Sequence, residues 1–428
     1  MKIAFKTLGC KVNQYETQLI KEQFLDAGFR EVSSGCPADV YVINTCTVTQ
    51  KTDSESRRLI RNARKKNPVS RIVVTGCYAE LDRDEIEKVA DKLLIIKNSE
   101  KNKILQYFIL DNRHSNTKKC LSPNYIEVTG TIGNNIGKTT ISRFEGRTKA
   151  FVKVQDGCDN FCSYCKVPLV RGRSISRKVD EIIGEITQLI SNGYKEIILS
   201  GICLGDWGRK SSLKLNWLLD EIENKVYGDF RVRISSIEPW YVTSELIQKI
   251  ANSKKVCRHL HIPMQSGDDE VLRNMNRDFS SADFVALINR LRSLIPEAAF
   301  TTDVLVGFPG ETEEQFKNTL RVVGLTRPSR VHIFPYSRRK GTKAYNFKDT
   351  APNHIARDRI NRLKAIADNL AVEYKRQFIG KAVEVLVESK RDRKTGLLVG
   401  YTDTYVKVAF QGPDELKGTL RSIKMPSP

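Results

Sequence analysis

Apolar runs alternate with amphipathic stretches along the N-terminal part of the chain. The pattern predicts strands at KIAF (2–5), VYVIN (40–44) and RIVVTG (71–76). Helical patterns follow these runs at 14–27, 54–67 and 82–90. Repeated strand–helix units indicate a parallel sheet covered by helices, so we expect an α/β, Rossmann-like domain over residues 1–110.

A second strand–helix series begins near residue 150. Helical patterns separate its apolar runs, and a long charged helical stretch at 354–378 closes it. The runs are AFVKVQ (150–155), EIILSG (196–201), FRVRISSI (230–237), HLHIPM (259–264), AFTTDVLVG (299–307) and RVHIFPYS (330–337). Six such units predict a partial (β/α)6 barrel over residues 147–375, with its chemistry at the carboxyl ends of the strands.

Two further segments differ from these series. Residues 111–146 are rich in Ser, Thr, Asn and Gly and are interpreted as a connector. Residues 376–428 alternate apolar and polar positions at the period of a strand, which predicts a small antiparallel all-β domain. Small basic β-barrels of this kind often bind RNA, and an ordinary structural appendage is the alternative.

Composition adds a preference for polyanions and for metal or redox chemistry. The 428 residues carry a formal net charge of +21, which favours nucleic acid as a partner over a merely solvated basic surface. The chain contains no apolar run long enough to span a membrane, and its first residues do not resemble a signal peptide, so we expect a cytoplasmic protein. In that reducing compartment the ten cysteines are not expected to form a disulfide framework.

Three cysteines follow the three N-terminal strands, in the sequences TLGC, INTC and VTGC. The carboxyl ends of parallel strands share one edge of a sheet, so Cys10, Cys46 and Cys77 are predicted to converge on a shared metal site. The alternative is three small buried cysteines that act as apolar packing groups.

A second group of cysteines lies in GCDNFCSYCKVP, after the first strand of the second series. The spacing of Cys158, Cys162 and Cys165 allows them to hold three corners of one cluster. A [4Fe–4S] cluster accepts thiolates and would keep its fourth iron open. A zinc site completed by His259 or His261 is the alternative.

The spacing C-x-x-x-C-x-x-C after the first barrel strand resembles the radical S-adenosylmethionine (SAM) superfamily, in which the open iron binds SAM. Residues 147–177, 261–268 and 302–312, together with the three N-terminal cysteines, resemble the methylthiotransferase family. That resemblance implies a second [4Fe–4S] cluster on the N-terminal cysteines and a C-terminal TRAM domain that grips RNA. The opening TLGCKVNQYETQ is most similar to the branch acting on N6-threonylcarbamoyladenosine at tRNA position 37.

The resemblance also implies a reaction. One SAM methylates a sulfur atom at the N-terminal cluster, another yields a radical, and C2 of the adenosine receives the methylthio group. The expected partners are the anticodon stem-loop of tRNA, a reductase system and a sulfur donor. Alternatives are methylthiolation of isopentenyladenosine in tRNA or of a ribosomal-protein aspartate, and a non-catalytic iron–sulfur protein that binds RNA or senses redox state.

Other side chains are weaker candidates, for which loop packing, turns and solvated helix faces are the competing explanations. The candidates for binding SAM are Tyr164, Ser200, Gly201, Gln265, Ser266, Gly267, Gly307 and Phe308. The candidates for binding RNA are Arg57, Arg58, Arg61, Arg64, Lys390, Arg391 and Arg393. Arg171 and Arg173 suit either a SAM carboxylate or an RNA phosphate, and Cys203 stands where a polar residue is expected.

Overall fold

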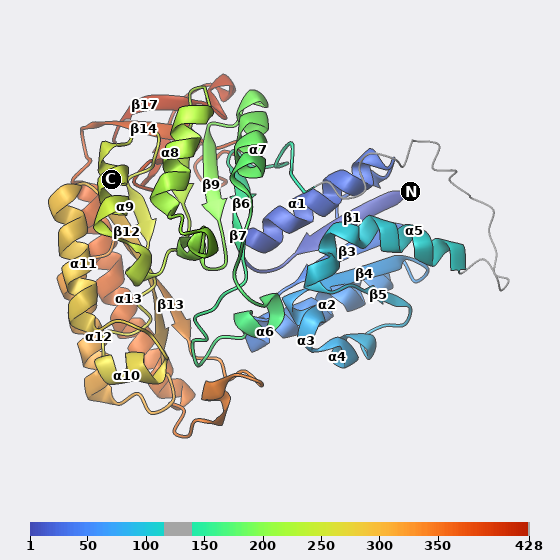
Figure 1. Ribbon diagram of the computed structural model, residues 1–428, viewed down its shortest axis with the longest axis horizontal. Helices are drawn as coiled ribbons and strands as arrows, with labels where there is room; N and C mark the ends of the chain where they lie inside the picture. The colour runs from blue at the N-terminus through green and yellow to red at the C-terminus, as the bar shows by residue number, and fades with distance from the viewer. Residues whose placement is uncertain (115–138, 427–428) are drawn as a thin grey trace. The chain divides into compact units, whose positions relative to one another are not determined.

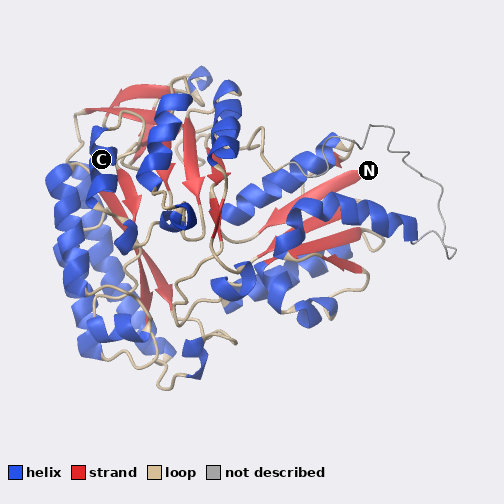
Figure 2. Cartoon of the chain, in the orientation of Figure 1, coloured by secondary structure: helices blue, strands red, loops and turns tan. Residues whose placement is uncertain are grey.

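The computed structural model describes residues 1–114 and 139–426, so most of the expected connector, with Cys120, lies outside the described residues. The chain divides into two compact units. The first contains residues 1–143 and 166–172, and the second contains residues 144–165 and 173–428. Figures 1 and 2 show that helices and strands alternate along the chain in both units.

The first unit is built on a parallel five-stranded sheet of order β2–β1–β3–β4–β5. Its strands are β1 (Lys2–Thr7), β2 (Arg30–Glu31), β3 (Val40–Thr45), β4 (Arg71–Gly76) and β5 (Leu93–Ile95). Its helices are α1 (Lys11–Asp26), α2 (Gln50–Lys66), α3 (Cys77–Leu81), α4 (Arg83–Glu87), α5 (Ile104–His114) and α6 (Val167–Arg171), with a 3₁₀ turn at Asn98–Lys103. The three predicted strands are present, whereas α3, α5 and α6 were not predicted.

Helices cover both faces of this sheet. Phe24 of α1 and Phe108 of α5 pack edge to face, 5.6 Å between ring centroids, over one side. Ile60 of α2 and Tyr78 of α3 are buried on the other side. A sheet that is buried on both faces needs nearly continuous apolar strands. For this reason the three apolar runs predicted the positions of its strands correctly.

The second unit begins with six parallel strands and ends with a small antiparallel sheet. The parallel strands form two three-stranded sheets, of order β6–β9–β10 and β11–β12–β13, and isolated parallel bridges such as Ser236 to His261 link them. The strands are β6 (Ala150–Lys153), β9 (Glu196–Ser200), β10 (Arg231–Ile234), β11 (His259–His261), β12 (Ala299–Val306) and β13 (Arg330–Pro335). A short antiparallel pair, β7 (Gln155–Asp156) with β8 (Ile175–Ser176), follows the first of them.

Helices connect successive parallel strands and cover one face of them. They are α7 (Val179–Ser191), α8 (Leu215–Lys225), α9 (Ser244–Asn252), α10 (Asp269–Asn274), α11 (Ser281–Leu294) and α12 (Glu313–Thr326), and a further helix, α13 (Asn353–Arg376), follows the last parallel strand. Phe300 of β12 packs on Phe284 of α11, so this face of β12 meets the helices. Alternation along the strand directs Thr301, Asp303 and Leu305 to the opposite, inner face.

The C-terminal residues form an antiparallel four-stranded sheet of order β16–β15–β14–β17. Its strands are β14 (Ala382–Val387), β15 (Leu398–Thr402), β16 (Lys407–Phe410) and β17 (Leu420–Lys424). Among the described helices, none is both long and apolar enough to cross a membrane.

Candidate functional site

The three N-terminal cysteines lie at one edge of the first sheet. Cys10 is the residue before α1, Cys46 follows β3, and Cys77 begins α3 directly after β4. Strands β1, β3 and β4 are neighbours in the sheet, which places all three thiols beyond adjacent carboxyl ends. The predicted convergence therefore has a direct geometric basis.

Two glycines allow these loops to approach one another. Gly9 has a φ of +96°, and a Cβ atom there would lie 2.9 Å from the Sγ atom of Cys46. Gly76 has a φ of +103°, and a Cβ atom there would lie 2.2 Å from the carbonyl oxygen of Thr45. Both close contacts and both backbone angles require glycine, which explains the G-C pairs in TLGC and VTGC.

Burial holds at least two of these thiols in the protonated state when no metal is bound. Desolvation raises the pKa of Cys46 to about 11, and the neighbouring thiols Cys77 and Cys10 add to the shift. Cys10 is an exposed residue, yet protein atoms crowd its thiol enough for desolvation to raise its pKa, against the attraction of Arg171. Three mutually interacting thiols form a suitable donor set for a soft metal or an iron–sulfur cluster, which would deprotonate them on binding.

A buried ionic group borders these thiols within the first unit. The Nη1 atom of Arg171 lies 2.8 Å from Oε1 of Glu16, and the Nζ atom of Lys101 lies 2.5 Å from Oε2 of the same carboxylate. Arg171 also donates to Asn13, whose amide donates to the carbonyls of Leu8 and Thr45. Arg171 thus braces the loops that carry the cysteines, and nothing in the sequence spacing indicated the contribution of Glu16 or Lys101.

The second group of cysteines occupies a loop of the second unit. The amide of Cys165 donates to the carbonyl of Cys162 at 3.0 Å, and Ser163 is tied to the end of α10 through the carbonyls of Asn274 and Met275. Phe161, within the loop, has a φ of +49° and is 51% exposed. These contacts fold residues 161–165, which include Cys162 and Cys165, into a compact turn.

A buried arginine faces one of these thiols. Arg277 lies 3.8 Å from the Sγ atom of Cys162 through Nη1, and its Nη2 atom lies 2.5 Å from Glu238. Desolvation raises the pKa of Cys162, and the charge of Arg277 opposes that rise. Sequence reasoning missed Arg277 and Glu238 because they lie far from the cysteine loop in the chain.

Cys203 lies beside Cys158, although the sequence interpretation left it without a role. A hydrogen bond between the two thiols lowers the pKa of Cys158 and raises that of Cys203. The amide of Cys203 donates to the side chain of Gln155 at 2.8 Å, and Gln155 in turn donates to the carbonyl of Gly157. In the metal-free protein the thiol of Cys203 therefore acts on the sulfur of Cys158.

The candidate SAM-binding residues fall into different environments. Tyr164 and Phe308 belong to one apolar cluster with Leu305, and burial raises the pKa of Tyr164. Ser200 is buried at the end of β9, and a side chain at Gly201 would meet Gln155.

The remaining candidates for SAM lie farther along the chain. Ser266 and Gly267 pack on Thr319 of α12, and Gln265 has a φ of +71° where it pairs with β12. Gly307 has a φ of +76°, and its amide donates to Glu311 at 2.7 Å. The structure therefore assembles these residues around the strand ends, with several of them serving the packing of the fold.

Some of the candidate RNA-binding residues have partners within the protein, and others are exposed. Arg57 donates to Tyr78, Arg58 pairs with Glu55, and Arg64 donates to backbone carbonyls, whereas Arg61 is exposed. In the C-terminal sheet Arg391 pairs with Asp414 at 2.6 Å, whereas Lys390 and Arg393 are exposed. Arg173 is 72% exposed and lies 3.0 Å from Asp159.

Family models match both parts of the chain. Residues 2–96 match the family described as uncharacterized protein family UPF0004, and residues 152–323 match the radical SAM superfamily. The solved structure of the radical SAM methyltransferase TsrM from Kitasatospora setae has a TM-score of 0.55 and 13% sequence identity, covering 78% of this chain and 72% of that one. The fold and the cysteine loop thus define a radical SAM enzyme, a class that uses SAM and a [4Fe–4S] cluster.

Comparison with known protein sequences identifies the family within the radical SAM class. The threonylcarbamoyladenosine tRNA methylthiotransferase MtaB of Bacillus subtilis is 39% identical, covering 99% of this chain and 93% of its own length. The MtaB protein of Thermotoga maritima is 37% identical over 99% of this chain and 94% of its own. A tRNA-2-methylthio-N6-dimethylallyladenosine synthase of Carboxydothermus hydrogenoformans is 33% identical, with coverages of 98% and 95%. The chain therefore belongs to the radical SAM tRNA methylthiotransferase family.

Proposed function

We propose that this enzyme attaches a methylthio group to C2 of N6-threonylcarbamoyladenosine at position 37 of tRNA. The product would be 2-methylthio-N6-threonylcarbamoyladenosine. The observation that carries the proposal is near full-length similarity: relatives named for this substrate are 34–39% identical over 94–99% of the chain. Relatives named for dimethylallyladenosine are 30–34% identical over comparable lengths.

We assign Cys158, Cys162 and Cys165 to a SAM-binding [4Fe–4S] cluster, and Cys10, Cys46 and Cys77 to a second [4Fe–4S] cluster. When bound, the first cluster and SAM supply a 5′-deoxyadenosyl radical, which is strong enough to remove the hydrogen atom from C2. The three thiols of each group and the coupling among their charges support the assignment.

The protein's own residues prepare these sites. Arg277 places positive charge 3.8 Å from the sulfur of Cys162, which favours the thiolate that binds iron. Gln155 joins the cysteine loop to the loop after β9, so the strand ends that surround SAM are held together. We expect SAM to contact the residues of these strand ends, including Ser200, Gly201, Gln265, Gly307 and Phe308.

The organisation of the chain supports an RNA substrate. We divide it into a Rossmann-like domain (1–110), a connector (111–146), a radical SAM core (147–375) and a TRAM domain (376–428). The exposed Lys390 and Arg393 of the C-terminal sheet and Arg61 of α2 suit phosphate contacts with an anticodon stem-loop. The reaction would take place in the cytoplasm with tRNA, a reductase as electron donor and a separate sulfur donor.

Mass spectrometry of tRNA nucleosides tests the proposal. The gene would be expressed in a host that makes threonylcarbamoyladenosine but lacks its methylthio form. Appearance of 2-methylthio-N6-threonylcarbamoyladenosine is expected. A methylthio group on dimethylallyladenosine alone would assign the enzyme to the other substrate, and purified protein unable to cleave SAM under reductant would indicate a non-catalytic protein.

Counting iron after anaerobic reconstitution tests the two clusters separately. The intact protein should hold about eight iron atoms per chain, and Cys10→Ala or Cys158→Ala should reduce this to about four. Cys36→Ala in the first unit and Cys257→Ala in the second are matched controls that should retain about eight. A value of about four in the unaltered protein would contradict the assignment of a second cluster.

A further inference from the structure

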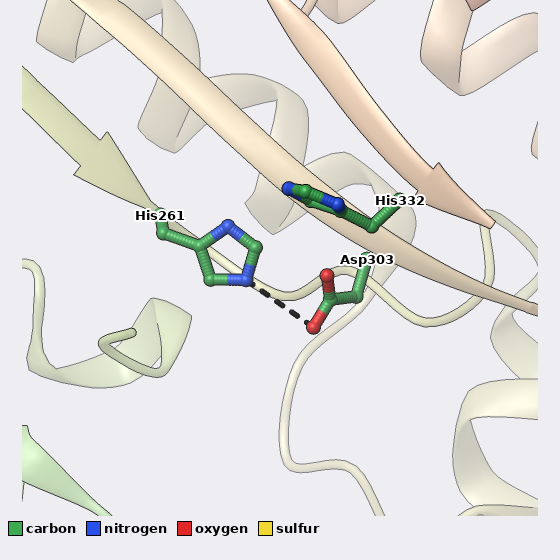
Figure 3. Close-up of side chains that lie close together, drawn as sticks. All are labelled: His261, Asp303 and His332. Carbon is green, nitrogen blue, oxygen red and sulfur yellow. Dashed lines mark ion pairs between the residues drawn. The ribbon is translucent and has the colours of Figure 1, made fainter. Parts of the chain in front are cut away.

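Two histidines and one aspartate lie together on the inner face of the second unit (Figure 3). The Nε2 atom of His261 lies 3.2 Å from Oδ2 of Asp303, and the rings of His261 and His332 are 5.5 Å apart between centroids. One ligand atom from each of the three residues lies within 4.8 Å of those of the others. We call this set the inner polar cluster.

Strand register brings the cluster together. His261 pairs with Thr301 of β12, and Asp303 pairs with His332 of β13. Paired residues of parallel strands point to the same face, and the opposite face of β12 is occupied by Phe300 and the helices. The three side chains therefore come from three adjacent strands and point away from the helices.

The cluster is oriented by the protein and remains accessible. The Nδ1 atom of His261 lies 2.8 Å from the hydroxyl oxygen of Thr301, which fixes the ring while Nε2 faces Asp303. The side chains of His261 and Asp303 are nevertheless 17% and 23% exposed. A polar group that is oriented and still open to solvent is suited to binding a ligand.

The inner face of β12 and β13 extends from the inner polar cluster toward the cysteine loop. Leu305, two residues beyond Asp303, belongs to the apolar cluster that includes Tyr164, the neighbour of Cys165. Phe334, two residues beyond His332 and paired with Leu305, is 45% exposed. Two residues of a strand advance about 6.6 Å, so an aromatic surface lies between the polar cluster and the cysteines.

We propose that the inner polar cluster binds the polar substituent on N6 of the substrate adenosine. This inference rests on the proposed function, since it concerns the adenosine that would be methylthiolated. A threonylcarbamoyl group carries a carboxylate, a hydroxyl and ureido N–H groups. The imidazole of His332 donates to an oxygen of this group, and the carboxylate of Asp303 accepts from its hydroxyl or ureido N–H, while the base lies against Phe334.

This arrangement would select against a dimethylallyl substituent. That group has no polar atoms, so binding it would remove water from the cluster without offering hydrogen-bond partners. Sites built to hydrogen-bond a substrate discriminate strongly against analogues that lack the polar groups. The cluster therefore distinguishes the two adenosine substituents named among the relatives.

A transition metal is the competing occupant, because two histidines and a carboxylate are a common set of metal ligands. Both ring nitrogens of His261 already have partners, Thr301 and Asp303. The 3.2 Å between Nε2 of His261 and Oδ2 of Asp303 would also fit two ligands of one metal ion. The exposed ring of Phe334 on the same face has no part in holding a metal but suits a base that carries a polar substituent, which favours the organic substituent.

Binding without turnover tests the inference on the reconstituted full-length protein without reductant. The probes are three stem-loop RNAs of one sequence, carrying threonylcarbamoyladenosine, dimethylallyladenosine or adenosine at position 37. The intact protein should prefer the first RNA. His332→Leu should weaken binding of that RNA about tenfold and leave the other two unchanged, as expected for loss of a hydrogen bond to a charged group.

Matched variants separate recognition from folding. His332→Gln keeps a donor and should restore part of the preference, whereas His354→Leu, an exposed histidine of α13, should behave like the intact protein. Asp303→Asn should also reduce the preference. Iron content and thermal unfolding, measured on every variant, identify any that fail to fold.

Several outcomes would overturn the inference. These are equal binding of the three RNAs by the intact protein, an unaltered preference in both His332→Leu and Asp303→Asn, or an equal loss for all three RNAs in well-folded variants. About one zinc or other metal ion per chain that disappears in His332→Leu would assign the cluster to a metal. The proposed function fails separately, if the intact protein binds selectively but forms no methylthio product.

Discussion

A buried ion triad should hold the C-terminal sheet against the parallel strands of the second unit. The carboxylate of Glu196, on β9, lies 2.7 Å from Arg231 and 2.9 Å from Arg233, both on β10, and none of its side chain is exposed. The two guanidinium groups also donate hydrogen bonds to backbone carbonyls at the C-terminal sheet. Arg231 donates to the carbonyl of Tyr401 at 2.7 Å, and Arg233 donates to that of Asp403 at 2.6 Å.

Glu196→Gln should therefore both destabilise the unit and loosen the sheet. Removing one member of a buried ionic group leaves uncompensated charge and costs about 3–5 kcal/mol, which would lower the melting temperature by about 10 °C. With Glu196 removed, the two arginines repel each other and no longer hold their orientation toward the carbonyls. Hydrogen exchange in residues 398–410 should accelerate, and tRNA should bind more weakly if this sheet contacts RNA.

The pH dependence of stability gives a second measure of the same group. Burial alone would raise the pKa of Glu196, but Arg233 and Arg231 outweigh it and hold the pKa well below the ordinary value. Because the folded pKa is below the unfolded one, this stabilisation is present above the unfolded pKa of about 4.5 and declines as the pH falls below it. Glu196→Gln should weaken that acid sensitivity.

Thermal unfolding and hydrogen exchange, monitored by mass spectrometry, would be compared with those of Glu384→Gln. Glu384 lies 3.8 Å from the same Arg231 but is 59% exposed, so its loss should cost less than about 1 kcal/mol. Equal melting temperatures for the two variants, or unchanged exchange in residues 398–410 of Glu196→Gln, would refute the proposed role of the triad.

Three further predictions concern other sites. Burial raises the pKa of Glu311 to about 7 in spite of Arg359. Between the ordinary glutamate pKa of 4.5 and pH 7 the folded state therefore holds an extra proton, so the melting temperature should fall as the pH rises through that window. The fall should be smaller in Glu311→Gln. Arg61→Ala should reduce the salt slope of tRNA binding by about one, whereas Arg64→Ala, which removes bonds to carbonyls, should mainly lower the melting temperature. Cys203→Ala removes a thiol hydrogen bond from Cys158, which we propose as a ligand of the SAM-binding cluster. The midpoint potential of that cluster should fall by roughly 20–40 mV in a redox titration monitored by electron paramagnetic resonance. An unchanged potential would contradict a role of Cys203 at the cluster.

The strands could be predicted from sequence because most of them are apolar and buried. Apolar runs located all the parallel strands of the two units except β2 and β5, which are two and three residues long. The helix expected at 82–90 is shorter in the structure, where α4 spans Arg83–Glu87, and the short helix α3 that precedes it was not predicted. Segments this short carry too few periodic positions to be recognised.

The position of Cys10, Cys46 and Cys77 at one edge of the first sheet could be predicted because strand topology determines where they lie. The inner polar cluster could not, since it depends on the register between three strands that are separated by 37 and 23 residues of chain. A shift of one residue in the register of β13 would direct His332 toward the helices, so His332 would no longer lie beside His261 and Asp303. Register comes from packing of the whole sheet, which single-sequence patterns do not specify.

Both groups of cysteines share one electrostatic arrangement that sequence spacing did not reveal. Arg171 and Arg277 are each about 1% exposed, and each has a carboxylate partner, Glu16 at 2.8 Å in the first unit and Glu238 at 2.5 Å in the second. An isolated buried guanidinium would be costly, and its carboxylate removes most of that cost. The cationic end still faces a thiol, so it opposes the desolvation that keeps the metal-free thiols protonated. Each pair thus lowers the cost of forming the thiolates that the proposed clusters require, without leaving the metal-free protein with an unpaired buried charge.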